Sequence, residues 1–453
     1  MTSDSVRVAP VLDQVLRDLR GLIEIPSVSS MPEHDEDVLT CAAEVERLLR
    51  EIGCPEVRQL EAGGKPAVYG HFPAPEGAPT VLLYAHYDVQ PTGALDAWTT
   101  PPFEPTERNG RLYARGAADD KGGLAVHLAA LRAFNGQPPV GVKVLVEGEE
   151  EIGSPTMLAM IEKYPDEFTA DAHVITDAMN WQTGQPSLTT SLRGNVDAVV
   201  RVSTSGSGLH SGGFGGAVPD ALTALCRLLA TLHDDAGNVA IEGLVQREAP
   251  DLEYGEQRLR DEADLLEGVQ LLGEGSVVQR LWMKPTASVL AIDTTRIADA
   301  SNTLIPQASA KVSVRLAPGQ DVAAATNALH THLRENAPWG AHVEIEAGRA
   351  SAASEISMDS THAQAAVDAL TEAFGVAPVE VGIGGSIPIV AAFAERFPES
   401  TVLVTAVVDP HSRMHSNDES MDLGDFAKAC QAEALFLQRL GRDAGAAREA
   451  ASS

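Results

Sequence analysis

The sequence predicts an α/β domain, with a mixed, mostly parallel sheet and helices on both faces, interrupted by a smaller inserted α+β domain. Near both ends of the chain, continuous apolar runs such as 81–85 alternate with helical patterns such as 123–134. Such runs are typical of strands that are buried on both faces of a parallel sheet. In the middle of the chain, residues 196–203 alternate apolar and polar side chains, which indicates half-exposed strands. The length of 453 residues accommodates two or three domains.

The α/β domain is predicted to comprise residues 1–192 and 354–453. Its helices are indicated by helical apolar spacing and its strands by short apolar runs. The predicted helices lie near 11–19 and at 37–52, 123–134, 156–164, 361–374 and 423–439, and the predicted strands at 67–72, 80–85, 142–146, 173–176 and 401–407. The Ala- and Ser-rich tail from Asp443 onward is expected to be disordered.

The inserted domain is predicted to comprise residues 193–353. Its elements are, in order, a strand at 196–203, a helix at 219–233, strands at 287–293 and 308–316, a helix at 322–335 and a strand at 342–346. This β-α-β-β-α-β order is that of a ferredoxin-like two-layer domain. Residues 241–284 are expected to form a polar, mostly helical insertion before the second strand.

The composition argues against several classes of function. Hydrophobic residues make up 44% of the chain and charged residues 21%, as in soluble globular proteins. The formal net charge of −31 disfavours a nucleic acid or an anionic membrane surface as partner. The four cysteines show no Cys-x-x-Cys spacing, and neither a signal segment nor an apolar run of membrane-spanning length is present. A cytoplasmic protein with reduced thiols is therefore expected.

Histidines and acidic residues follow several predicted strands. They are His86 after the strand at 80–85, Glu150 and Glu151 after that at 142–146, Asp177 at the end of that at 173–176, and His415 beyond that at 401–407. In open α/β sheets, ligands gather outside the carboxyl ends of the strands, so these positions can converge. Two histidines with several carboxylates suit zinc or manganese, and one bridging carboxylate describes a dinuclear hydrolytic centre.

Five separated motifs resemble those of a known family. They are His86-Tyr-Asp88, Gly116-Ala-Ala-Asp119-Asp120-Lys-Gly-Gly123, Glu150-Glu151-Ile-Gly153-Ser, the strand-ending Asp177, and His415-Ser. In this order they are similar to the dinuclear zinc metallopeptidases that include carnosinases, cytosolic non-specific dipeptidases, aminoacylases and succinyl-diaminopimelate desuccinylase. The dipeptidase and carnosinase branch is the most similar, through Tyr84-Ala-His-Tyr-Asp-Val-Gln-Pro91, Ser191-Leu-Arg-Gly194, Leu209-His-Ser-Gly212 and Gly384-Gly-Ser-Ile-Pro388.

The resemblance implies two divalent metal ions per subunit, zinc or, alternatively, manganese. Asp119 would bridge the two ions. His86 and Asp177 would complete one site, and Glu151 and His415 the other. His411, four residues before His415, is the main rival as a ligand, and Ser416 after His415 favours the latter.

The resemblance also implies the catalytic groups. Glu150 would be the general base that takes a proton from the metal-bound water and passes it to the leaving amine. Asp88 would orient His86. The assignment within Glu149-Glu150-Glu151 depends on the position of Gly153-Ser154, so a shift by one residue stays open. Asp120 is expected to support the turn and the helix start, after a cis Asp119–Asp120 bond.

The inserted domain would act as a lid and as the contact of a homodimer. His210 resembles the lid histidine that reaches into the neighbouring subunit's site and stabilises the oxyanion. Asn302 resembles a substrate-contacting residue. Arg315 would clamp the substrate's C-terminal carboxylate near Gly385 and Ser386, although an outward-facing surface arginine is a competing interpretation.

The leading hypothesis is a dinuclear metallopeptidase that cleaves dipeptides or short peptides. The alternative is an N-acyl amino acid amidohydrolase of the same fold, and an aspartate at 177 favours peptidase work within the family. A third hypothesis, a catalytically silent binding protein, would require a missing ligand or base, and none is missing.

Overall fold

The computed structural model describes residues 5–385 and 387–451. The chain divides into two compact units. Unit 1 consists of Met1–Thr190, Ile356–Val381 and Pro388–Ser453, and unit 2 consists of Ser191–Glu355 and Gly382–Ile387. The predicted insertion, 193–353, therefore falls within unit 2, which also takes a short glycine-containing segment from the C-terminal part of the chain.

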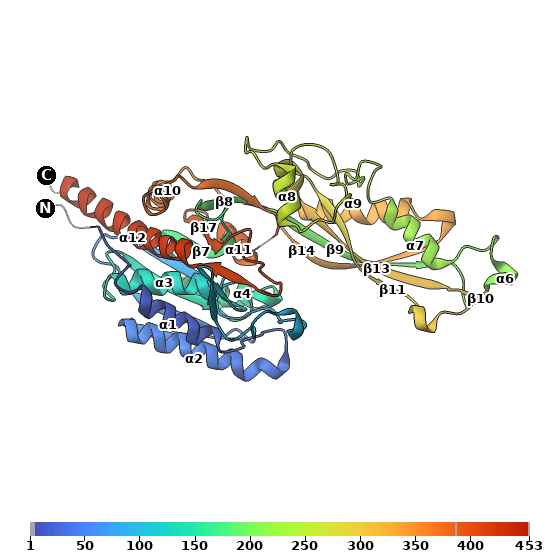
Figure 1. Ribbon diagram of the computed structural model, residues 1–453. Coiled ribbons are helices and arrows are strands. Elements are labelled where there is room, and N and C mark those ends of the chain that lie inside the picture. The colour runs from blue at the N-terminus through green and yellow to red at the C-terminus, as the bar shows by residue number, and fades with distance from the viewer. Residues whose placement is uncertain (1–4, 386, 452–453) are drawn as a thin grey trace. The chain divides into compact units, whose positions relative to one another are not determined.

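A six-stranded mixed sheet is the centre of unit 1 (Figure 1). Its strands, in spatial order, are β1 (Glu56–Leu60), β2 (Ala67–Phe72), β6 (Gly141–Glu147), β3 (Thr80–His86), β7 (Ala172–Met179) and β17 (Thr401–Val408). The four strands β6, β3, β7 and β17 run parallel to one another. Strand β2 is antiparallel to β6, and β1 is antiparallel to β2. This is the mixed, mostly parallel sheet that the buried apolar runs predict.

The helices of unit 1 and its short strands complete the domain. The helices are α1 (Leu12–Ile23), α2 (Asp35–Ile52), α3 (Lys121–Ala133), α4 (Met157–Lys163), α5 (Pro165–Phe168), α10 (Thr361–Phe374), α11 (Pro388–Arg396) and α12 (Leu423–Ala451). The short strands β4 (Thr106–Arg108), β5 (Arg111–Tyr113) and β18 (Ser420–Asp422) pair with one another. A third sheet consists of β8 (Ser187–Leu192) and β16 (Val379–Ile383), which cross the boundary between the units, and β15 (Ser354–Glu355), which falls in unit 2.

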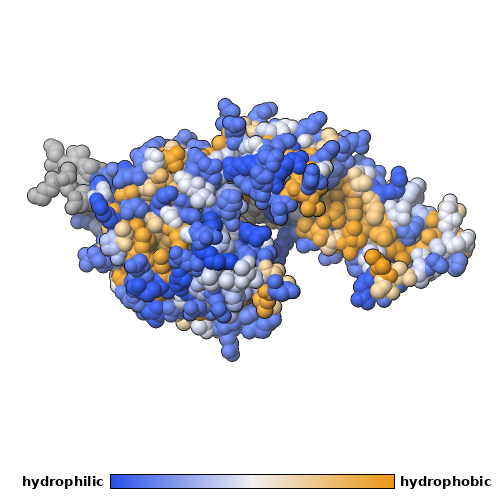
Figure 2. All heavy atoms as spheres, in the orientation of Figure 1, coloured by the Kyte–Doolittle hydropathy of each residue, from blue (hydrophilic) through white to orange (hydrophobic). Residues whose placement is uncertain are grey.

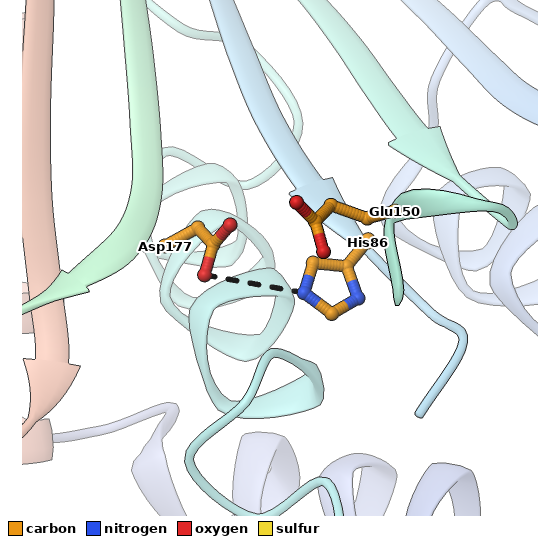
Figure 3. A group of neighbouring side chains, drawn as sticks. All are labelled: His86, Glu150 and Asp177. Atoms are coloured by element: carbon orange, nitrogen blue, oxygen red, sulfur yellow. Dashed lines mark ion pairs between the residues drawn. The ribbon is translucent and has the colours of Figure 1, made fainter. Parts of the chain in front are cut away.

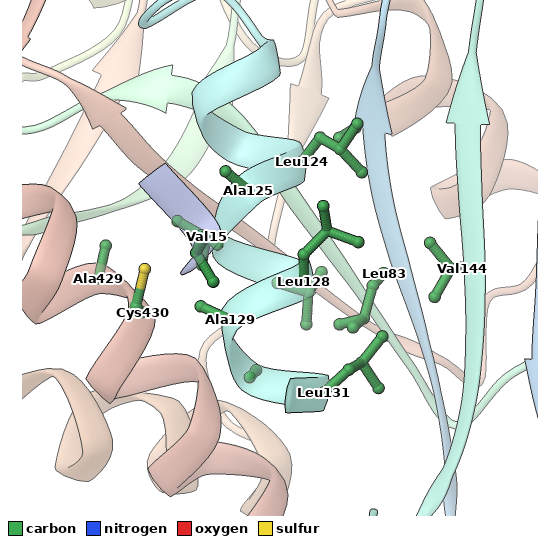
Figure 4. Packing of buried hydrophobic residues seen from close by; sticks show 14 of the residues in the cluster. Val15, Leu83, Leu124, Ala125, Leu128, Ala129, Leu131, Val144, Ala429 and Cys430 are labelled. Atoms are coloured by element: carbon green, nitrogen blue, oxygen red, sulfur yellow. The ribbon is translucent and has the colours of Figure 1, made fainter. Parts of the chain in front are cut away.

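Helix α3 anchors one face of the six-stranded sheet (Figure 4). Its side chains Leu124, Leu128 and Leu131 are fully buried and belong to the same core cluster as Leu83 of β3 and Val144 of β6. On the other side of α3, alanines allow close approach of α1 and α12. Since every residue from Lys121 to Leu131 is buried, the start of this helix is held firmly, and the site described below lies there.

The opposite face of the sheet is covered by α5 and α11. The ring of Phe393 lies 6.2 Å from that of Phe168 and 4.2 Å from that of His173, between ring centroids. Both faces of the sheet are therefore covered by helices, as predicted for strands with continuous apolar runs.

Two predictions about chain segments are wrong. Residues 241–284 are not mostly helical: they contain only the short helix α8 (Glu256–Glu262) and the π-helical turn Gln279–Met283. Five glycines and a proline interrupt the segment, and they disfavour longer helices. Residues 443–451 are not irregular, because they belong to α12. Alanine has the highest helix propensity, and the tail is rich in it.

Unit 2 is a two-layer domain. Its antiparallel sheet has the order β11 (Thr286–Asp293), β13 (Gln307–Leu316), β9 (Gly194–Ser203) and β14 (His342–Ser351). Helices α7 (Ala221–Ala230) and α9 (Val322–Glu335) pack with this sheet around one core cluster. The chain order β9-α7-β11-β13-α9-β14 is the predicted ferredoxin-like order. The remaining elements are the small pair β10 (Leu209–His210) and β12 (Thr303–Leu304), and α6 (Ser211–Phe214).

Strand β11 is an edge strand with an exposed apolar surface. Leu290 is 57% exposed and Ile292 is 45% exposed. Figure 2 shows hydrophobic residues gathered over the sheet of unit 2. Exposed apolar edge strands readily pair with another chain, so this strand is a candidate for a contact between protein molecules.

Within residues 5–385 and 387–451, no helix has the combination of length and apolarity needed to cross a bilayer.

Candidate metal centre

The candidate site lies at the carboxyl ends of three adjacent parallel strands, β6, β3 and β7. His86 is the last residue of β3, and Glu150 begins the 3₁₀ turn Glu150–Ile152 that follows β6. Asp177 lies two residues before the end of β7, so the strand continues past the predicted end. The side chains of these three residues point toward one another (Figure 3). Convergence of strand ends is thus what brings together residues that are distant in the sequence.

The ligand-type side chains form two groups. One consists of His86, Glu150 and Asp177, and the other of Asp119, Glu151 and His415. Within each group, one potential ligand atom from each residue lies within 4.8 Å of the others. Each group has the nitrogen and oxygen donors that a zinc or manganese ion accepts.

Asp119 connects the two groups. Its Oδ1 lies 3.2 Å from His86 Nε2, and its Oδ2 lies 2.9 Å from His415 Nε2. His86 Nε2 is also 4.0 Å from Asp177 Oδ1, and His415 Nε2 is 3.4 Å from Glu151 Oε2. One carboxylate that presents a different oxygen to each histidine has the geometry of a bridging ligand.

Asp88 holds the strand ends in place. His86 Nδ1 lies 3.0 Å from the backbone oxygen of Asp88 and 3.4 Å from its carboxylate Oδ1. A proton on Nδ1 donated to that backbone oxygen leaves Nε2 free as a ligand atom. The Asp88 carboxylate also accepts the backbone N–H groups of Glu150 and Glu151, at 3.2 and 3.1 Å. Asp88 therefore positions a histidine and the turn that carries both acids.

Asp119 is held by a buried ion pair that the sequence analysis missed. Glu419 accepts the backbone N–H groups of Ala118 and Asp119, at 3.0 and 3.1 Å, through one oxygen. Its other oxygen accepts Arg115 Nη1 at 2.6 Å. Both partners are buried. Glu419 lies four residues after His415 in an acidic run. This nearness to a candidate ligand is the sequence feature from which its role could have been predicted.

The Asp119–Asp120 peptide bond is cis, as the resemblance implies. Asp120 precedes α3, but its side chain caps no N–H group of that helix, so the expected support of the helix start does not come from a side-chain cap. Its Oδ2 instead accepts the backbone N–H of His86 at 3.2 Å. Gly123 allows this arrangement, because a Cβ atom there would lie 2.0 Å from Asp120 Oδ1.

The two histidines have raised pKa values. Burial alone would lower the pKa of His86, but its contacts with Asp119 and Asp88 raise it well above the usual value. Contacts with Asp119 and Glu151 raise the pKa of His415 to about 10. Metal ions and protons compete for imidazole nitrogens. The carboxylates that favour a proton on each histidine would therefore also favour a metal ion at the same nitrogen.

The carboxylates of the site are crowded. Burial raises the pKa of Glu150 to about 7, and the charges of Glu151 and Asp119 contribute. Burial and the nearby Glu150 raise the pKa of Asp177 well above its ordinary value. Buried carboxylates that repel one another are stabilised by a cation among them.

The neighbouring candidates Glu149 and His411 lie outside both groups. Glu149 accepts the backbone N–H of Lys65 at 2.8 Å and the hydroxyl of Thr156 at 2.5 Å. His411 is exposed and lines a separate pocket with Arg413. These contacts favour the assignment of the site acids to Glu150 and Glu151 over an assignment shifted by one residue to Glu149 and Glu150. They also favour His415 over His411 as the metal ligand.

The residues present fit a pair of divalent cations. Glu151 Oε1 is buried and accepts no hydrogen bond from the described residues, although two imidazoles and several carboxylates surround the region. Its Oε2 accepts Gln90 Nε2 at 2.7 Å. Gln90 belongs to the Tyr84–Pro91 motif but was not singled out from the sequence. An unused carboxylate oxygen in such a donor set is suited to a metal ion.

The other predicted site residues belong to unit 2. His210 and Asn302 lie on neighbouring segments, since β10 pairs with β12 and Ser211 N donates to Asn302 O at 2.8 Å. His210 Nδ1 accepts the N–H of Gly213 at 3.1 Å. Arg315 lies in β13, and Gly385 follows β16. Ser386 lies outside the described residues.

Two groups of potential metal ligands, connected by Asp119 at the edge of an α/β sheet, form a candidate dinuclear metal centre of the kind that metallohydrolases use. The chain belongs to peptidase family M20/M25/M40, whose sequence profile matches residues 82–439. This confirms the family that the motifs indicate.

Named relatives agree with this family. The chain is 35% identical to the cysteinylglycine-S-conjugate dipeptidase of Corynebacterium striatum, covering 97% of this chain and 98% of that protein. It is 28% identical to the β-Ala-His dipeptidase of Homo sapiens, over 93% and 88%. Among solved structures, the dipeptidase Dug1p of Saccharomyces cerevisiae has a TM-score of 0.83 at 25% identity, covering 96% and 97%. Human carnosine dipeptidase 1, at 24% identity, shares the fold with the same TM-score and coverage.

Proposed function

We propose that this protein is a metal-dependent dipeptidase. The observation that carries the proposal is the pair of ligand groups joined by Asp119, with the half-buried Glu150 next to His86 and Asp177. Relatives of similar length that are named as dipeptidases support a dipeptide as substrate.

Five residues would hold the two metal ions. Asp119 would bridge them, His86 and Asp177 would complete one site, and Glu151 and His415 the other. Zinc is the expected metal, with manganese as the alternative, because both accept imidazole and carboxylate ligands. Bound divalent ions supply Lewis-acid polarisation of the scissile carbonyl and lower the pKa of coordinated water.

Glu150 would move the proton. Among the described residues its carboxylate accepts no hydrogen bond, whereas that of Glu149 accepts two. A carboxylate that is not used in a structural contact is available as a general base. It would take a proton from the attacking water and deliver it to the amine that leaves. Asp88 would keep Glu150 in place through the backbone of the turn.

Unit 2 would supply the substrate contacts. His210 would stabilise the oxyanion from a partner subunit, Asn302 would contact the substrate, and Arg315 with Gly385 and Ser386 would hold its C-terminal carboxylate. The protein would then act as a homodimer in the cytoplasm. The exposed apolar edge strand β11 supports a contact between two copies of unit 2.

A substrate panel tests the function. Metal-stripped protein is reloaded with zinc or manganese and assayed on unblocked dipeptides and on N-acyl amino acids with matched C-terminal residues. We expect hydrolysis of dipeptides, with kcat/KM at least roughly tenfold above that for the acyl amino acids. Cleavage of acyl amino acids alone would instead identify the protein as an amidohydrolase and contradict the proposal.

A further inference from the structure

A buried histidine of helix α3 contacts two strands that carry candidate metal ligands. His127 is fully buried. Its Nε2 lies 3.0 Å from the backbone oxygen of Tyr84 on β3 and 3.4 Å from the hydroxyl oxygen of Thr176 on β7. Tyr84 precedes His86 by two residues, and Thr176 directly precedes Asp177. His127 therefore contacts both strands just before two ligands of the same candidate metal ion.

The contact of His127 lies where the backbone pairing of β3 and β7 ends. The two strands pair in parallel over four residue pairs, the last of which is Tyr84 with Ile175. On its other side, β3 stays paired with β6 as far as His86. A side-chain bridge at the end of the β3–β7 pairing can fix the distance between the two strand ends. The separation of 4.0 Å between His86 Nε2 and Asp177 Oδ1 depends on that distance (Figure 3).

Both ring nitrogens of His127 face hydrogen-bond acceptors. Nδ1 lies 3.0 and 2.9 Å from the two carboxylate oxygens of Glu433 on α12, and the backbone oxygen of Tyr84 faces Nε2. An ionised carboxylate and a backbone oxygen can only accept, and a neutral imidazole carries a proton on only one nitrogen. The two contacts together therefore require the imidazolium form. Burial by itself would lower the pKa of His127, but the charge and hydrogen bond of Glu433 raise it above its ordinary value.

Glu433 is the charged partner of this imidazolium. It is buried, and within the described part of the chain its carboxylate forms an ion pair with His127 alone. The other titratable side chains on the contacting elements are Cys430 on α12, Tyr84 on β3 and Asp177 on β7, and none of them hydrogen-bonds to the ring. Buried ion pairs often add little net stability relative to apolar side chains of similar size. The location of this pair next to the ligand strands therefore points to a positional role.

We propose that His127, as an imidazolium held by Glu433, is a positioning residue that fixes the ends of β3 and β7 and so sets the affinity for the metal ion bound by His86 and Asp177. The inference rests on the proposed function and deepens it, because it names a residue outside the ligand set that controls one of the two metal sites. The second site takes its own ligands from the turn after β6 and from the loop that carries His415. The competing explanation is that the ion pair only holds α3 against α12.

The test measures the two zinc dissociation constants of each variant by competition with a chelator. His127→Leu removes both N–H groups at similar volume, and His127→Gln keeps one amide donor. For His127→Leu we expect one dissociation constant to rise by roughly tenfold or more, while the other changes less than about threefold. His127→Gln should lie between the wild type and His127→Leu.

His173→Leu is the matched control. His173 is also fully buried, and its ring nitrogens lie 2.9 Å from Phe168 O and 2.7 Å from Ser400 Oγ. It lies on β7 four residues before Asp177, away from the strand end. Its replacement should lower the melting temperature, because two buried hydrogen bonds are lost, but leave both zinc dissociation constants within about threefold of wild type.

A second pair of backgrounds assigns the affected ion. His415→Ala removes a ligand of one site and leaves the ion at His86 and Asp177, and adding His127→Leu should weaken the binding of that ion by a similar factor. Asp177→Ala leaves the ion at His415, and adding His127→Leu there should change its binding less than about threefold. The reverse pattern would overturn the inference.

Nitrogen NMR of the imidazole ring gives a readout that is independent of metal affinity. The His127 signal is assigned by its absence from His127→Leu. In the zinc-loaded wild-type protein at neutral pH it should show protons on both ring nitrogens, and in Glu433→Gln a proton on one. A neutral His127 ring in the wild type would contradict the inference.

The outcomes separate the inference from the function. If His127→Leu weakens both ions equally or neither, the role of His127 is merely structural, and the inference is overturned while the dipeptidase function stands. Wild-type protein that binds no zinc would remove the proposed function and the inference with it. If thermal melting shows that His127→Leu does not fold, His127→Gln decides: weaker binding of one ion only supports the inference, and an equal loss at both sites or no loss overturns it.

Discussion

Replacing Glu150 with glutamine is expected to lower kcat for dipeptide hydrolysis by at least about a hundredfold. Glutamine has almost the same shape as glutamate but cannot accept a proton from water. The backbone N–H of residue 150 would still donate to Asp88, so the turn after β6 stays in place. Because Glu151 and the other proposed ligands are unchanged, the metal content should stay near two ions per chain by elemental analysis.

Glu149→Gln is the matched control in the same acidic triplet. The Glu149 side chain holds Lys65 N and Thr156, so its replacement is expected to lower the melting temperature. The kcat of Glu149→Gln should stay within about threefold of wild type, since this side chain belongs to neither ligand group. A Glu150→Gln protein with wild-type kcat, or a Glu149→Gln protein that is folded but inactive, would contradict the assignment of the base.

Replacing His415 with alanine is expected to remove one of the two metal ions. His415 is the only imidazole in the group with Asp119 and Glu151, so that site would keep carboxylates alone. Loss of a ligand imidazole weakens a zinc site strongly, and kcat/KM should fall by at least about a hundredfold. Bound zinc and dipeptide hydrolysis are measured on the same preparation.

His411→Ala provides the comparison on the same loop. His411 is exposed and its backbone N–H, which the substitution preserves, donates to Asp409 Oδ1 at 2.7 Å. This variant should bind both metal ions and turn over dipeptide as the wild type does. Loss of metal from His411→Ala together with retention in His415→Ala would reverse the ligand assignment.

The sheet and the general position of the site could be predicted from the sequence because local patterns determine them. The run Val81–Ala85 is apolar throughout, which predicts a buried parallel strand, and His86 follows it directly. Parallel strands share one carboxyl edge, so the residues after β6 and β7 meet His86 there.

Other features depend on contacts between distant residues and could not be predicted from such patterns. The support of Asp119 comes from Glu419, three hundred residues further along the chain. Asp120 resembles a helix cap in sequence, but its carboxylate accepts the backbone N–H of His86 and caps no N–H group of the helix. Residues 241–284 contain polar stretches with helical spacing, yet their glycines keep most of the segment irregular.

The roles within the acidic triplet were implied by the family resemblance and not by the pattern of charges. The hydrogen bonds of the structure separate Glu149 from the other two acids, because Glu149 accepts from Lys65 N and Thr156 while Glu150 and Glu151 lie in the groups with the histidines. A run of three glutamates has no local signal that would make this distinction, since neighbouring side chains of a turn point in different directions.

The central claim is that hydrolysis depends on two metal ions held by one bridging aspartate. It is tested most directly by adding zinc or manganese stepwise to metal-stripped protein while dipeptide hydrolysis is followed. We predict negligible activity without metal and a plateau at about two equivalents per chain. An Asp119→Ala protein should reach no such plateau. Full activity of the metal-stripped protein, or wild-type activity of Asp119→Ala, would contradict the claim.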